Sequence, residues 1–207
     1  MVRKPFLVIA LWACAVPAMS CVTPMTSVPT DAQVERAHAY LQSLKECEPL
    51  NPANPPPGFP SSKRPVPRWK QYTKSQLKAI TFLDAGCSSF SDAGLAIFSN
   101  FETIEAMYLV RTKISDDGLR VVSKMRNLES LVLHTTFVSD VGVGHLRDLP
   151  RLQSLGLDHT RLTNRSVEYF LSMKALKRVR VSRTGITEQA IRDARQVRRD
   201  LAIEKDY

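Results

Sequence analysis

Cysteine, histidine and glycine are scarce in this chain of 207 residues, which contains 4, 4 and 8 of them respectively. No C-x-x-C pair and no histidine spacing typical of zinc ligands occurs, so we predict no metal site. The sequence also lacks a glycine-rich phosphate loop and a nucleophile elbow around serine or cysteine. We therefore predict no catalytic residue and no cofactor, and we expect a protein that is not an enzyme.

The apolar run near the N-terminus is too short to cross a membrane comfortably. It extends from Pro5 to Val16, about 12 residues, whereas a transmembrane helix needs about 20. Two basic residues precede the run, and small residues follow it at Ala18 and Ser20. This layout is typical of a secretory signal peptide, and it predicts an exported protein.

Cys21 directly follows the segment Ala-Met-Ser at positions 18–20, which resembles a bacterial lipoprotein cleavage site. In that family the new N-terminal cysteine is acylated, so the resemblance implies a lipid on Cys21 that anchors the protein in the cell envelope. The match departs from the pattern because Ala18 replaces the favoured leucine and Pro17 is unusual. Cleavage after Ala18 or Ser20 without acylation, which gives a secreted protein, therefore stays open. The membrane leaflet is not indicated.

Two cysteines are left in the mature chain. Cleavage removes Cys14 and acylation occupies Cys21, so Cys47 and Cys87 form an even pair in an oxidising compartment. We predict a disulfide between them on parity and compartment alone. The alternative is that both are small buried apolar side chains.

The segment before residue 69 divides into three parts. Residues 1–20 are the predicted signal peptide, and residues 21–48 are a tether followed by a short helical arm. The arm, from Asp31 to Cys47, has Val34, Ala37 and Leu41 on one helical face. Residues 49–68 are rich in proline and form a predicted linker, and residues 69–207 form the main domain.

The main domain repeats itself every 24 residues, five times without an insertion. Each copy reads approximately L-x-x-L-x-L-x-x-T-x-I-[ST]-[DN]-x-G-L. This pattern resembles leucine-rich repeats of the cysteine-containing type and those of short bacterial proteins. The resemblance covers about residues 77–200, and it implies an α/β fold. The expected fold is a right-handed leucine-rich repeat solenoid with a parallel concave sheet and short convex helices.

The repeat pattern also predicts the position of each element. Strands are expected near 81–85, 105–109, 129–133, 153–157 and 177–181, with a last short strand around 201–203. Helices are expected near 92–99, 116–123, 140–147, 164–172 and 188–199. A cap helix is predicted from Trp69 to Ala79, since terminal repeats need a cover.

Three polar or small positions recur within each repeat. A threonine or serine follows the strand, and we expect its hydroxyl to bond the backbone of the neighbouring coil. Serine or threonine followed by an acidic residue or asparagine precedes each helix, and we expect both to cap its start. A glycine or small residue, as at Gly94, Gly118 and Gly142, is expected to let the helix approach the next coil.

The residues between buried strand positions are expected to face the concave surface. The chain carries a net charge of +9, and its positive residues concentrate at the C-terminal end. The concave face therefore grades from apolar to basic, which favours an acidic partner. His134, Asp158 and His159, midway along this face, are close enough in register for a metal or acid–base site. An ordinary polar surface is the simpler interpretation. The predicted ligand-binding residues are Tyr108, Val132, His134, Asp158, His159, Arg178, Arg180 and Arg183.

These features favour a non-enzymatic protein-binding module that docks a protein or an anionic polymer on its concave face. A nucleic-acid partner is not expected, because the chain is predicted to be exported and lacks a recognisable nucleic-acid motif. One alternative is a structural component of an envelope complex that packs through the solenoid ends. Another is a substrate adaptor like the ubiquitin-ligase receptors that share the repeat, although no F-box-like segment precedes the repeats here. Oligomeric state is not indicated.

Overall fold

The computed structural model of this chain describes residues 28–45 and 68–206. The predicted signal peptide, Cys21, Cys47 and most of the proline-rich segment lie outside these residues. Within the described residues, no helix is long and apolar enough to cross a membrane.

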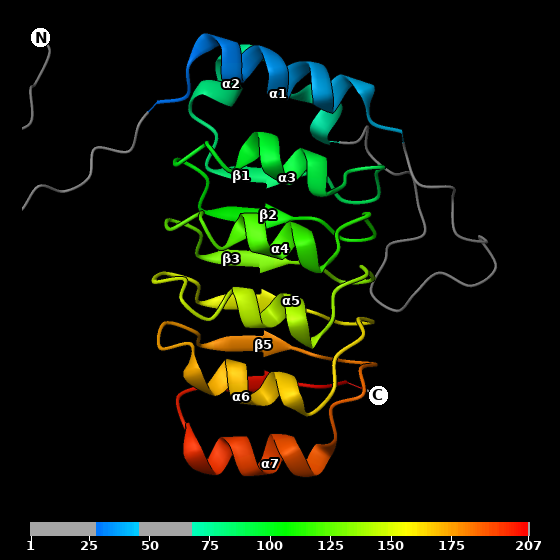
Figure 1. Cartoon of the computed structure of the whole chain (residues 1–207), viewed down its shortest axis with the longest axis vertical. Coiled ribbons are helices and arrows are strands. Elements are labelled where there is room, and N and C mark those ends of the chain that lie inside the picture. Colours follow the sequence, from blue (N-terminus) through cyan, green and yellow to red (C-terminus); the bar gives the residue numbers. More distant parts are fainter. Residues whose placement is uncertain (1–27, 46–67, 207) are drawn as a thin grey trace, which may run out of the picture.

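Short strands and helices alternate along the repeats (Figure 1). Every strand has three residues: β1 Phe82–Asp84, β2 Ala106–Tyr108, β3 Ser130–Val132, β4 Ser154–Gly156, β5 Arg178–Arg180 and β6 Ala202–Glu204. The helices between them are α3 Asp92–Phe98, α4 Asp116–Val122, α5 Asp140–His145, α6 Arg165–Ser172 and α7 Glu188–Val197. These elements confirm the positions predicted from the repeat, including the last strand.

The six strands form one parallel sheet in the order of the sequence, β1 to β6. Each strand pairs with the next at a shift of 24 residues, as in Leu83↔Met107 and Leu131↔Leu155. Helices α3 to α7 stack along the other side of the coils (Figure 1). The predicted leucine-rich repeat solenoid is therefore confirmed.

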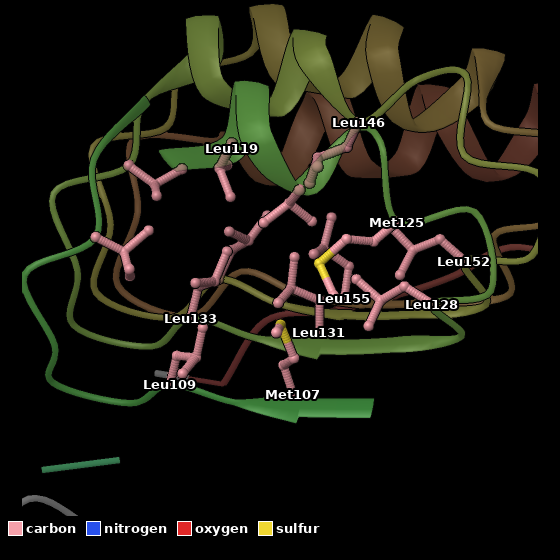
Figure 2. Close-up of a cluster of buried hydrophobic side chains, with 14 of the residues drawn as sticks. Met107, Leu109, Leu119, Met125, Leu128, Leu131, Leu133, Leu146, Leu152 and Leu155 are labelled. Atoms are coloured by element: carbon pink, nitrogen blue, oxygen red, sulfur yellow. The ribbon is translucent and has the colours of Figure 1, made fainter. Parts of the chain in front are cut away.

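A continuous apolar core lies between the sheet and the helices (Figure 2). Strand residues such as Met107, Leu131 and Leu155 point inward toward helix residues such as Leu119 (Figure 2). One repeat cannot bury this face alone, so the stack of coils is what removes the apolar side chains from water.

The N-terminal end of the core is closed by helix α1, Asp31–Ser43. Thr30 begins this helix with a capping box that involves Gln33. Val34, Ala37 and Leu41 are fully buried, and α1 packs against α3 of the first repeat. The predicted arm therefore covers the end of the solenoid.

Two short helices replace the single cap helix predicted from Trp69 to Ala79. They are the 3-10 helix η1, Arg68–Gln71, and α2, Lys74–Lys78. The chain breaks between them because Thr73 caps α2 through its own capping box. Tyr72, in the break, donates its hydroxyl to Phe82 O at 2.9 Å and accepts from Asp84 N at 3.1 Å. One side chain thus covers the outer edge of β1.

The threonine column after the strands bonds differently from the prediction. Each hydroxyl donates to the carbonyl three residues earlier in its own coil, as Thr112 does to Leu109 O at 2.7 Å. Thr136 and Thr160 make the same bond to Leu133 and Leu157. The expectation of bonds to the neighbouring coil was wrong, because the turn after the strand brings the carbonyl of the same coil closer.

The aspartate at the start of α3, α4 and α5 joins two coils. Asp92 accepts from Ser115 N at 3.0 Å and from its hydroxyl at 2.6 Å, one repeat further along the chain. Asp116 binds Ser139 in the same way, at 2.7 and 2.6 Å. The prediction that Ser91 and Ser115 cap their helices through the side chain was wrong, because neither makes that bond.

The small residues of α4 and α5, Gly118 and Gly142, make room for this carboxylate. A β-carbon on Gly118 would overlap the carboxylate of Asp92 and come within 2.9 Å of Leu95, both in the preceding coil. In the fourth repeat Ser166 replaces glycine, and its hydroxyl donates to Asp140. The glycine therefore allows close approach, as predicted, but toward the preceding coil and not the next one.

The C-terminal end is closed by basic side chains that bind carbonyl groups. Arg198 donates to Met173 O and Leu176 O, both at 2.8 Å, and Arg195 donates to Ile203 O at 2.8 Å. Lys205 donates to Ile186 O at 2.5 Å. These three cations of the basic C-terminal end stabilise the cap.

Candidate binding surface

The predicted ligand-binding residues lie in adjacent columns on the outer face of the sheet, here called the sheet face. Tyr108, Val132 and Arg180 share one column with Gly156, and Arg178 lies in the column beside it. His134 and Asp158 occupy the next position along the coil, where hydrogen bonds join neighbouring coils. The structure therefore brings the two ends of the predicted set onto one surface, although they come from different repeats.

A ladder of side-chain bonds fixes the middle of this surface. His134 Nδ1 accepts from Asp158 N at 2.9 Å, and Asp158 Oδ1 accepts from Ser182 N at 2.8 Å. Ser182 Oγ then accepts from Asp206 N at 2.8 Å. Each polar side chain thus satisfies the backbone N–H of the next coil. The sequence contains this ladder as a polar residue repeated every 24 positions, but its bonding was not predicted.

His134 is neutral near pH 7 with its proton on Nε2. Burial lowers the pKa of His134; Asp158 opposes this shift, and Arg180 and His159 add to it. Nδ1 already accepts a hydrogen bond from Asp158 N, so its distance of 3.3 Å to Asp158 Oδ2 is a close approach and not an ion pair. The ring therefore serves as a fixed hydrogen-bond acceptor in the ladder.

Aromatic rings lie directly over glycines on the sheet face. A β-carbon at Gly86 would come within 2.9 Å of the Tyr108 ring, and one at Gly156 within 2.6 Å of the His134 ring. Burial raises the pKa of the Tyr108 hydroxyl, with Asp84 and Cys87 adding to the shift and Arg180 opposing it. The glycines thus let two flat rings lie along the sheet.

The basic end of the sheet face is partly neutralised. Arg178 approaches Glu204 at 3.5 Å, and Arg180 approaches Asp158 at 3.2 Å and Asp206 at 3.9 Å. Glu204 and Asp206 belong to the sixth coil, which contributed no residue to the predicted ligand-binding set. The face therefore carries alternating charges at this end, where the sequence had predicted a strongly basic surface.

Two predicted residues, His159 and Arg183, belong to a column of residues at which the chain turns out of the sheet. Its five residues have positive φ between 54° and 58°, a conformation that residues other than glycine rarely adopt. In the first four of these residues a hydrogen bond from the N–H group to the neighbouring coil holds the turn, as for His159 N to Ser182 O at 2.9 Å. No sequence signal marked the turn, because glycine is absent from the column. Its members are Cys87, Arg111, Thr135, His159 and Arg183.

No group of three or more potential metal ligands occurs among residues 28–45 and 68–206. His159 is exposed on its turn, whereas His134 and Asp158 are tied into the ladder. The partner predicted for Cys87, Cys47, lies outside the described residues, so the disulfide stays a prediction.

Comparison with known proteins supports the fold. No family model and no curated protein matches the chain. The structure is similar to that of internalin C2 from Listeria monocytogenes, with a TM-score of 0.50 and 17% identity over 61% of this chain and 52% of that chain. The chain thus spans about half of that structure.

Two weaker similarities have TM-scores of 0.39. One is a leucine-rich repeat protein of Leptospira interrogans, 19% identical over 53% of this chain and 27% of that chain. The other is the internalin InlF of Listeria monocytogenes, 20% identical over 54% of this chain and 37% of that chain.

The depressed pKa of His134 predicts a specific loss of stability in acid. The imidazole is less basic in the folded chain than its unfolded value of about 6.5, so the unfolded state binds the extra proton. This stability is complete above about pH 6.5 and is lost as the pH falls toward the folded pKa. We expect the free energy of unfolding, from urea titrations between pH 7.5 and 5, to fall less in His134→Gln than in the wild type. Parallel curves for the two proteins would contradict the buried neutral imidazole.

Proposed function

We propose that this chain is a non-enzymatic module that binds a protein partner on its sheet face. The observation that carries the proposal is the sheet of six paired strands, which lies opposite the helices (Figure 1) and bears the side chains of the sheet face. The strands hold these side chains in fixed register, so a partner meets a surface that needs little ordering. Its similarity in fold to an internalin gives the structural class and no partner.

The chemistry of the sheet face suits a protein. Phe82, 38% exposed, lies at one end with Tyr108 and Val132 beside it, both half-buried. Arg178 and Arg180 lie at the other end. Aromatic residues and arginine are the side chains that contribute most at protein interfaces. The polar ladder between the two ends engages the side chains of His134 and Asp158 and holds the middle of the surface in place.

We propose further that the partner presents carboxylates to the arginines. The side chain of Arg178 is 63% exposed, and its ion pair with Glu204 is solvent-accessible. Exposed pairs of this kind contribute only about 0–1 kcal/mol, so a partner carboxylate exchanges for Glu204 at little cost. Arg183 is exposed on the adjacent turn and extends the positive surface.

A double substitution that adds one negative charge and reverses one positive charge tests the sheet face. Val132→Glu combined with Arg178→Glu should reduce capture of the partner about tenfold or more in a crosslinking pull-down from the native cells, because it introduces repulsion into the contact. The matched control is Val197→Glu with Arg120→Glu, which changes one valine and one arginine on the helical side. Circular dichroism verifies the fold of both variants. Equal capture of one partner by wild type and both variants would reject the sheet face as the binding surface.

We propose that the chain is exported and anchored by a lipid on Cys21. The support is the charged, apolar and small-residue layout of positions 1–20 and the position of Cys21 directly after it. Residues 22–30 separate Cys21 from α1, and nine residues span at most about 30 Å. Because α1 packs on the first repeat, this anchor holds the β1 end of the solenoid close to the membrane.

Metabolic labelling tests the anchor. In a bacterial host given labelled palmitate, the wild-type chain should incorporate the label, and Cys21→Ser should lose it. Cys14→Ser is the matched control and should retain the label. A wild-type chain that is cleaved but carries no label would support plain secretion, and an uncleaved cytosolic chain would remove export altogether.

A further inference from the structure

One edge of the solenoid carries a second surface, which shares only Arg183 with the predicted site. It lies where the chain leaves each strand and turns toward the helix. We call it the basic edge and define it by Lys113, Phe137, Arg161 and Arg183. The first three occupy the same position in successive repeats, and Arg183 belongs to the neighbouring column of left-handed turns.

The backbone of the basic edge is fixed by hydrogen bonds between coils. Lys113 N donates to Phe90 O at 2.7 Å, Phe137 N to Ile114 O at 3.0 Å and Arg161 N to Val138 O at 2.9 Å. Neighbouring strands of a sheet lie about 4.8 Å apart, so Lys113 and Arg161 are about 10 Å apart with Phe137 between them. The edge therefore presents a cation, an aromatic ring and a second cation in fixed order.

The charges of the basic edge are not compensated within the described chain. Lys113, Arg161 and Arg183 are exposed, and none forms an ion pair with a carboxylate of residues 28–45 or 68–206. The contrast is with Arg180, which is ion-paired, and Arg198, which binds backbone carbonyls. The two columns that form the edge contain no aspartate or glutamate: Cys87, Arg111, Thr135, His159 and Arg183, then Ser89, Lys113, Phe137, Arg161 and Gly185.

Phe137 adds an apolar contact in the middle of these charges. Its side chain is 54% exposed, and the guanidinium carbon of Arg161 lies 5.5 Å from the centre of its ring. The cation–π contact orients Arg161 along the edge and occupies one face of the ring. An aromatic ring flanked by cations matches a partner that carries carboxylates on both sides of one apolar group.

We propose that the basic edge binds an acidic, extended polypeptide segment with one apolar side chain at its centre. Carboxylates of the segment pair with Lys113 and Arg161, the apolar side chain packs on Phe137, and Arg183 extends the attraction by one coil. A polypeptide is favoured over a stacked nucleic-acid base because Arg161 already covers a face of the ring. This proposal does not depend on binding at the sheet face.

A synthetic peptide tests the basic edge without a known partner. The probe has the core Glu-Glu-Leu-Glu-Glu between Gly-Ser flanks and carries a fluorescent label for anisotropy measurements at low salt with the whole chain. We expect the double variant Lys113→Glu, Arg161→Glu to weaken binding about tenfold or more, because it reverses both flanking charges. We expect Phe137→Ala to weaken binding of this peptide severalfold. For a second peptide, with serine in place of the central leucine, we expect Phe137→Ala to change the affinity little.

Matched variants separate this surface from the rest of the molecule. Lys124→Glu with Lys174→Glu makes the same charge change in the loops that follow the helices, at the opposite edge, and should leave binding within about twofold. Val132→Glu with Arg178→Glu should also leave it unchanged, so failure of the sheet-face proposal is visible separately. No binding at about 1 mM peptide, equal losses in all double variants, or tighter binding of single-stranded DNA than of the peptide would overturn the proposal.

Discussion

The structure depends on each coil completing the hydrogen bonds of its neighbour. A strand of three residues is too short to be stable alone, and a coil of 24 residues cannot bury its own apolar face. The stack supplies both, through the parallel ladder on one side and through hydrogen bonds that Asp92, Asp116 and Asp140 accept from the next coil on the other. Burial raises the pKa of Asp140, but hydrogen bonds from Ser166 and Thr163 outweigh it and lower the pKa. The carboxylate of Asp140 therefore bridges coils in its charged form.

The need to complete the hydrogen bonds of each coil also decides which charged side chains are left to meet a partner. Arg195, Arg198 and Lys205 belong to the basic C-terminal end of the sequence, yet they bind carbonyls that the last coil leaves open. Arg180 is held by Asp158, whose own carboxylate serves the ladder of the sheet face. Lys113 and Arg161 neither bind open carbonyls nor pair with a carboxylate of the described chain. The positive charge of the basic edge is therefore less compensated than that of the sheet face, although the charge distribution along the sequence had pointed to the sheet face.

The sequence was sufficient for the fold because one period controls every level of it. Leu131 and Leu155 repeat at 24 residues, and this repeat places them in adjacent strands of one sheet. Bonding details were harder to predict, because the acceptor of the Thr112 hydroxyl, Leu109 O in its own coil, is set by the geometry of the turn and not by the repeat pattern. A strand was expected in the sixth coil, but the acidic residues of this coil were not assigned to the sheet face. The pairing of Arg178 with Glu204 was therefore missed. The left-handed turn at Arg111 carries no glycine to reveal it.

A single pair of variants tests most directly whether the acidic column holds the coils together. Asp116 and Asp117 are neighbours in the first turn of α4, so both interact similarly with the helix dipole. Asp116 binds Ser139 of the next coil, whereas Asp117 is 83% exposed beside Arg120. We expect Asp116→Ala to lower the free energy of urea unfolding by about 2 kcal/mol and Asp117→Ala to change it by less than about 0.5 kcal/mol. Equal effects of the two substitutions would contradict the central role of the bridge between coils.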